Sequence, residues 1–132
     1  MCFMKHDLMA RKDIEELLLG FYDTAFKDPL IGFYFTQIAH LDLETHLPVI
    51  ADFWENIIFS NGKYKGNAIQ PHQVLHRLSP FQDVHFDRWV FLFTQAIDQM
   101  FEGPNAELAK QRAQSIATVM KIKIIHQNFP KP

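Results

Sequence analysis

This sequence has little cysteine and glycine, almost no excess of charge of either sign, and no long apolar run. Its 132 residues include one cysteine, Cys2, which excludes an internal disulfide. No apolar stretch reaches the roughly 18 residues that a membrane span needs, and the N-terminus has no apolar run resembling a signal peptide. The net charge of −2 provides no basic surface for nucleic acid or for an anionic membrane. We therefore expect a cytoplasmic monomer that binds neither nucleic acid nor membrane.

Apolar and aromatic residues are abundant instead. Hydrophobic residues make up 48% of the chain and aromatic residues 14%, with 13 phenylalanines. That composition is too apolar for a disordered chain, and the length suits one hydrophobic core. We expect a single domain spanning residues 1–132.

Helical periodicity accounts for most of the apolar positions. Apolar residues three and four apart form one face of a helix, and such stripes begin at Ile14, His46, Phe86 and Leu108. No segment of useful length alternates with a period of two, so no sheet is expected. The predicted N-terminal caps are Asp13, Asp42 and Asp83, and the predicted helix breaks are Asp28-Pro29, Ser60-Asn61-Gly62 and Gly103-Pro104. The fold class is all-α, with four main helices and short ones between them.

A short segment between two of these helices carries two histidines. Pro71 fits a first helical turn, where its missing N–H would be unpaired anyway, so His72 and His76 lie on one helical face. Tyr22, His46 and Trp89 are further polar side chains on or beside apolar stripes. Buried polar groups need partners, so these five should converge on a polar group or make private hydrogen bonds.

Four kinds of site compete for these residues. A structural zinc site needs four ligands at tight spacing, and the two histidines supply only two. A nucleophilic triad would need a marked serine or cysteine, and a di-iron bundle would need Glu-x-x-His motifs; the sequence has neither. A haem needs one histidine on iron, an apolar aromatic pocket and a few donors opposite. Each residue taken singly is more often an ordinary core residue, so spacing leaves a haem site and a plain helical core both open.

Four blocks of the sequence resemble the group III truncated haemoglobins, and they cover nearly the whole chain. The blocks are Phe21-Tyr22 with Asp28-Pro29-Leu30-Ile31-Gly32 and Phe35, then His46 to Trp54, Tyr64 to His72, and His85 to Trp89. The chain also has no Gly-Gly pair, which other groups of truncated haemoglobins carry at helix ends and which group III lacks.

The resemblance implies a two-over-two helical sandwich and one haem b, with its iron held by a proximal histidine. The run from Tyr64 matches His72 without a gap, so we expect His72 to be the metal ligand and its other ring N–H to donate to a backbone carbonyl. More residues separate His72 from Trp89 than in the shortest group III members, which leaves His76 open as the ligand. The implied distal residues, which contact a bound gas, are Tyr22, His46 and Trp89. The implied haem contacts are Phe35, His46, Ile50, Phe53, Tyr64, His72, His76, Arg77, Phe86 and Trp89, with His76 and Arg77 near the propionates.

The implied function is binding of O2, CO and NO at a five-coordinate haem iron. The alternative is a haem redox enzyme, an NO dioxygenase or a peroxidase-like protein. That alternative would need a separate reductase, because the sequence has no flavin or nicotinamide fingerprint. A third interpretation is a helical domain that has lost haem, which the presence of Tyr22, His46, His72 and Trp89 disfavours.

Overall fold

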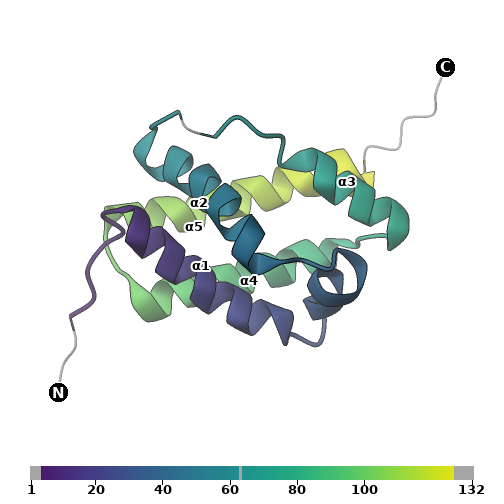
Figure 1. Ribbon diagram of the computed structural model, residues 1–132, viewed down its shortest axis with the longest axis horizontal. Coiled ribbons are helices and arrows are strands. Elements are labelled where there is room, and N and C mark those ends of the chain that lie inside the picture. Colours follow the sequence, from purple (N-terminus) through teal and green to yellow (C-terminus); the bar gives the residue numbers. More distant parts are fainter. Residues whose placement is uncertain (1–3, 63, 127–132) are drawn as a thin grey trace.

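Every regular element of the described structure is helical. The structure is a computed structural model that describes residues 4–62 and 64–126, so Cys2 lies outside it. The elements are α1 (Arg11–Phe26), the π-helix η1 (Tyr34–Ile38), α2 (Leu43–Phe59), α3 (Ile69–Leu78), α4 (Asp83–Met100), α5 (Pro104–Met120) and the π-helix η2 (Lys121–His126) (Figure 1). The predicted all-α class is confirmed. The two π-helical turns were not predicted, because they have no apolar period of their own.

The four long helices form two packed pairs. α1 packs on α2 and α4, and α5 packs on α4 and α2. α3 is placed differently: it lies beside η2 and also contacts η1, at one end of the molecule (Figure 1). No helix in residues 4–62 or 64–126 is both long and apolar enough to cross a membrane.

Two of the three predicted caps are wrong in position. The N-cap of α1 is Ala10, and Asp13 lies within the first turn. Its buried carboxylate accepts hydrogen bonds from the N–H groups of Met9 and Ala10, at 2.9 and 3.1 Å. The N-cap of α4 is Gln82, one residue before Asp83, whereas Asp42 is the N-cap of α2 as predicted. Aspartate is favoured both at the N-cap and in the first turn of a helix, which explains offsets of one to three residues.

Arg11 ties α1 to α2. Its Nη1 lies 2.5 Å from Asp52 Oδ1 and 2.9 Å from Glu55 Oε1, and its Nη2 donates to the Pro48 carbonyl at 3.1 Å. The hydrogen bond to Asp52 is the largest influence on the guanidinium and raises the pKa of Arg11 above its ordinary value. Pro48, which has no N–H, is accommodated inside α2.

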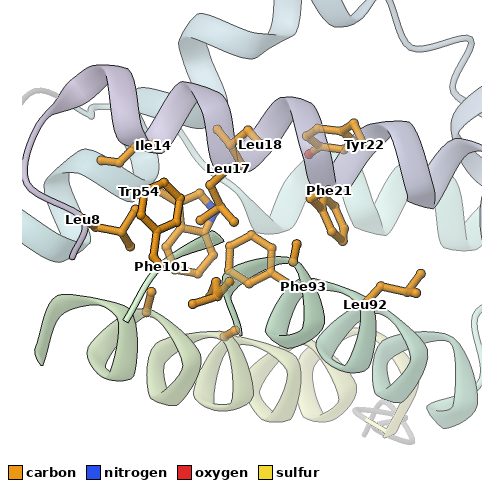
Figure 2. Close-up of a cluster of buried hydrophobic side chains, with 14 of the residues drawn as sticks. Leu8, Ile14, Leu17, Leu18, Phe21, Tyr22, Trp54, Leu92, Phe93 and Phe101 are labelled. Carbon is orange, nitrogen blue, oxygen red and sulfur yellow. The ribbon is translucent and has the colours of Figure 1, made fainter. Parts of the chain in front are cut away.

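The buried side chains form two clusters. The larger lies between α1, α2, α4 and α5, where Phe21 of α1 points toward Phe93 of α4 and Trp54 of α2 packs nearby (Figure 2). The smaller gathers around Tyr34, Phe81, Phe86, Met120 and Ile124, next to α3. Half-buried Trp89 packs against both clusters. The two clusters therefore meet at a tryptophan that the sequence singled out.

Candidate haem site

The short helix α3 carries both candidate histidines. Asn67, which precedes the N-cap Ala68, stabilises the start of this helix, because its Oδ1 accepts hydrogen bonds from the N–H groups of Ile69 and Gln70 at 3.0 and 3.2 Å. Pro71 is the third residue of α3, within the first turn as predicted. No residue of α3 is fully buried. Contacts with η1 and η2 therefore hold α3 at the edge of the smaller cluster.

The His72 ring is held in one tautomer. Its Nδ1 lies 2.7 Å from the carbonyl oxygen of Ala68, one turn earlier in the chain. A carbonyl only accepts, so Nδ1 carries the proton and Nε2 carries the lone pair. Burial lowers the pKa of His72 and outweighs the opposite effect of the Ala68 hydrogen bond. At neutral pH His72 is therefore a neutral imidazole with an unprotonated Nε2, which is the form a metal requires.

The His76 ring is held in the opposite tautomer. The backbone N–H of Phe81 donates to its Nδ1 at 2.9 Å. Because Nδ1 accepts this bond, neutral His76 carries its proton on Nε2 and presents a donor. The ring also stacks on Phe81, with centroids 6.1 Å apart and planes 14° from parallel. The two histidines share a helix but offer different chemistry: His72 has a free lone pair, whereas His76 has a free N–H.

Phe81 lies at the centre of the ring contacts around the two candidate histidines, and sequence reasoning missed it. Its ring lies 4.4 Å from Tyr34, 5.0 Å from Phe86 and 6.5 Å from His72, measured between centroids. It lies in the link between α3 and α4, where no helical period identifies a residue as buried. Tyr34 is fixed in turn, because its hydroxyl lies 3.0 Å from the carbonyls of Ser79 and of Pro80.

Tyr22 is the first predicted distal donor. Only 8% of the residue is exposed, and its ring packs edge-on against Phe35 and Phe21, at 5.7 and 4.9 Å. No hydrogen bond joins its hydroxyl to another residue in the part of the chain that the structure describes. Burial raises the pKa of Tyr22. The phenol therefore keeps its proton and remains a hydrogen-bond donor at neutral pH.

Trp89 lies close to Tyr22, with one side chain between them. Its ring stacks on Phe93, with centroids 5.2 Å apart, and meets Phe21 edge-on at 6.2 Å. Phe21 contacts Tyr22 as well. Among residues 4–62 and 64–126, no partner accepts a hydrogen bond from the indole N–H. Two unpaired donors, one from α1 and one from α4, thus flank Phe21.

The predicted residues from α2 and its following loop are brought together only in part. Ile50 and Phe53 are half-buried against the larger cluster, and Phe53 meets Tyr64 edge-on at 5.2 Å. Gly66 folds closely over that tyrosine, since a Cβ there would lie 2.7 Å from the Tyr64 hydroxyl oxygen.

His46 and Arg77 stand apart from these contacts. Both side chains are exposed, His46 in the first turns of α2 and Arg77 in the last turn of α3. Within the described residues, neither forms a ring contact or an ion pair. The contacts therefore join Tyr22, Phe35 and Trp89 on one side and His72, His76 and Phe86 on the other.

An ion pair between the buried Asp28, just after α1, and the partly exposed Arg88 of α4 was also missed. The Asp28 side chain is 2% exposed, and its Oδ1 lies 2.9 Å from Arg88 Nε and 2.8 Å from Arg88 Nη2. Its Oδ2 accepts hydrogen bonds from the N–H groups of Leu30 and Ile31, at 3.0 and 3.1 Å. Burial alone would raise the pKa of Asp28, but the bonds from Arg88, Ile31 and Leu30 outweigh it and lower that pKa.

The lowered pKa of Asp28 predicts a specific acid sensitivity. A carboxyl group whose native pKa lies below its unfolded value, about 3.9, contributes stability above that pH and loses it as the pH falls through the native pKa. At pH 7 we expect Asp28→Asn to lower the free energy of unfolding by about 2 kcal/mol. Breaking a fully buried ion pair would cost more free energy of unfolding, but the Arg88 side chain is 36% exposed and its charge is partly screened by water. Urea unfolding from pH 7 to pH 3 should show the gap between wild type and variant narrowing below about pH 4. A gap independent of pH would contradict this account.

Comparison with known proteins gives two matches of nearly full length. The chain is 29% identical over 118 residues to the group 3 truncated hemoglobin ctb of Campylobacter jejuni, covering 87% of this chain and 91% of that protein. The crystal structure of a group III truncated hemoglobin from Campylobacter jejuni superimposes with a TM-score of 0.81 at 26% identity. That match covers 96% of this chain and 99% of the other. No protein-family model matches the chain.

The paired helices and this structural match define the fold of a truncated globin, so the predicted two-over-two sandwich is confirmed. Within that class both matches are to group III truncated haemoglobins, in agreement with the resemblance of the four sequence blocks. The likeness supports a globin, and haem binding is what a globin of this kind implies.

Proposed function

We propose that this protein binds haem b through His72 and accommodates a diatomic gas, O2, CO or NO, between Tyr22 and Trp89. The observation that carries the proposal is the hydrogen bond from His72 Nδ1 to the Ala68 carbonyl, which leaves Nε2 unprotonated. When bound, haem supplies an iron with a free coordination position for a small ligand. His76 is disfavoured as the iron ligand because its Nδ1 accepts a hydrogen bond from the Phe81 N–H, so the neutral ring carries its proton on Nε2 and has no lone pair there for a metal.

The surrounding residues fit a haem. Phe35, Ile50 and Phe53 are apolar and only partly covered by protein, so they are available as walls for a porphyrin. Phe86 lies beneath the proximal side, against Phe81, and Tyr64 extends the wall from the loop after α2. These apolar surfaces would keep water from the bound group, and their burial against a porphyrin would favour binding.

Polar groups are available where the carboxylates of a haem edge would need them. His76 presents an N–H at Nε2, and Arg77 is exposed on the same helix without an ion pair to a described residue. Both are suited to a propionate, and Arg77 can donate two parallel hydrogen bonds to one carboxylate.

The distal donors would act on a gas in the pocket. The Tyr22 hydroxyl and the Trp89 indole N–H each have a proton available to donate, which favours O2 over CO because O2 is the better acceptor at such a site. Each neutral hydrogen bond contributes about 1 kcal/mol. The exposed position of His46 fits a role at the pocket entrance, where its side chain would move to admit a ligand.

Absorption spectroscopy tests the proposal directly. Protein expressed with haem available should show a Soret band, and treatment with dithionite and then CO should give the spectrum of a CO complex with histidine opposite the gas. Pyridine extraction identifies the haem, and we expect haem b. Purified, folded protein that fails to take up added haem in stoichiometric amount would refute the proposal.

The redox-enzyme alternative remains a prediction, because no contact among the described residues favours it. It is tested by mixing the oxygenated protein with NO and following re-reduction by a cellular reductase over repeated turnovers. A single turnover does not discriminate, because many oxygenated haem proteins oxidise NO once.

A further inference from the structure

The Asp28–Arg88 ion pair is held by more interactions than a simple ion pair at the protein surface. The Asp28 carboxylate accepts hydrogen bonds from Arg88 Nε and from two backbone N–H groups, and Arg88 Nη2 lies 2.8 Å from its Oδ1 as an ion-pair contact. The Arg88 guanidinium also lies over the Phe91 ring, 5.2 Å from its centroid. The arginine is therefore held from two sides, and its direction is fixed.

The pair lies where the three elements of the distal side meet. Asp28 comes two residues after the end of α1, which carries Tyr22. The N–H groups that bind Asp28 Oδ2 belong to the turn leading into η1, which carries Phe35. The same turn is tight at Gly32, where a Cβ would lie 2.5 Å from the Phe26 carbonyl oxygen. Arg88 belongs to α4 and directly precedes Trp89. One carboxylate thus links the elements that carry Tyr22, Phe35 and Trp89.

We propose that Asp28 and Arg88 are positioning residues for the distal pocket, holding the Trp89 indole and the Tyr22 hydroxyl in the orientation that retains a bound gas. This inference rests on the proposed function. The pair does not touch the gas; it sets the rotation of α4 relative to the end of α1.

Helix geometry explains why this rotation matters. Successive side chains on an α-helix point about 100° apart, so fixing the direction of Arg88 also fixes that of Trp89. Side chains extend roughly 5–6 Å from the helix axis, so a rotation of about 10° moves an indole by about 1 Å. Hydrogen bonds weaken steeply when their distance and angle depart from the preferred range, so a shift of that size weakens a donor. Stacking on Phe93, a neighbour on the same helix, limits the tilt of the Trp89 ring, and the ion pair adds to the packing of α4 a restraint against rotation relative to the end of α1.

The test is a double-mutant cycle measured on the oxygenated holoprotein. Arg88→Met, Asp28→Asn and the double variant should each speed O2 dissociation by about three- to tenfold, measured by stopped flow. The double variant should be no faster than the faster single variant, since both remove the same constraint. The C–O stretching frequency of the CO complex, which reports the polarity around the gas, should shift in all three.

Arg88→Lys keeps the charge but not the two guanidinium nitrogens that face Asp28, so its O2 dissociation rate should lie between those of wild type and Arg88→Met.

Arg11→Met is the matched control. Arg11 also joins two helices through carboxylates, but it begins α1 and lies eleven residues before Tyr22. This variant should lower the melting temperature and leave both the O2 dissociation rate and the C–O frequency unchanged.

The readouts separate a positioning role from a purely structural one. If Arg88→Met and Asp28→Asn lower the melting temperature as Arg11→Met does but keep wild-type dissociation rates and C–O frequencies, the inference is wrong. If Arg88→Met does not fold, Arg88→Lys and Asp28→Asn decide by the same criteria. Tyr22→Phe serves as the reference: if it speeds dissociation while the ion-pair variants do not, only the positioning role fails. If Tyr22→Phe has no effect either, the proposed distal network fails as well.

Discussion

Replacing His72 by alanine should abolish stoichiometric haem binding. The variant removes the only candidate ligand on α3 whose Nε2 carries a lone pair, because Nδ1 donates to the Ala68 carbonyl. We expect the Soret absorbance relative to that at 280 nm to fall to a small fraction of the wild-type value. His72→Gly should recover much of the band when imidazole is added, since free imidazole fits the space that the side chain vacates.

His76→Ala is the matched control for that experiment. It lies on the same helix, one turn later, and its removal leaves the Phe81 N–H without its acceptor. The Soret band should therefore persist, with lower thermal stability because a backbone donor loses its partner. The reverse outcome, with the band lost in His76→Ala and a normal ferrous spectrum in His72→Ala, would assign the iron to His76.

Removing either distal donor should speed the escape of O2. Tyr22→Phe deletes one hydroxyl in a buried position, and Trp89→Phe deletes the indole N–H while keeping an aromatic ring. Each should raise the O2 dissociation rate by about tenfold, the equivalent of about 1.4 kcal/mol, and should affect CO dissociation much less. Stopped-flow displacement of O2 by CO measures the first rate, and displacement of CO by NO measures the second.

Tyr34→Phe tests whether the loss of any buried tyrosine hydroxyl has this effect. The Tyr34 hydroxyl donates to the carbonyls of Ser79 and Pro80, in the link between α3 and α4. Its removal should cost stability without changing the O2 dissociation rate. Equal acceleration in Tyr34→Phe and Tyr22→Phe would show general loosening, and unchanged rates in both distal variants would refute the distal network.

The sequence predicted those features that depend on local periodicity. The helical stripes located four long helices, and Pro71 correctly indicated a short helix carrying His72 and His76. Tyr22 and Trp89 were singled out because a polar group on an apolar stripe is unusual. The choice between the two histidines came from resemblance alone, because their spacing on the helix is symmetric. The hydrogen bonds that distinguish their tautomers involve Ala68 and the loop residue Phe81.

The features that were missed depend on contacts between distant residues. The sequence places Asp28 at a helix end and both Asp28 and Arg88 in family blocks, but it does not predict the ion pair that joins them across 60 positions of the chain. Phe81 lies in a link without periodicity, although it contacts both candidate histidines. Neither relationship leaves a local pattern, so only the tertiary arrangement reveals them.

The absence of any fully buried residue in α3 bears on the lifetime of the loaded protein. Segments with few buried apolar contacts open locally at a lower free-energy cost than the rest of a domain. α3 is such a segment, since none of its residues is fully buried and it lies at the edge of the smaller cluster, against η1 and η2. A prosthetic group bound to α3 would stabilise the segment by its binding free energy. Opening of α3 would then be the first step in release of the group. The rate of cofactor loss would then depend on the free energy of local opening of these ten residues, which hydrogen exchange measures, rather than on global unfolding.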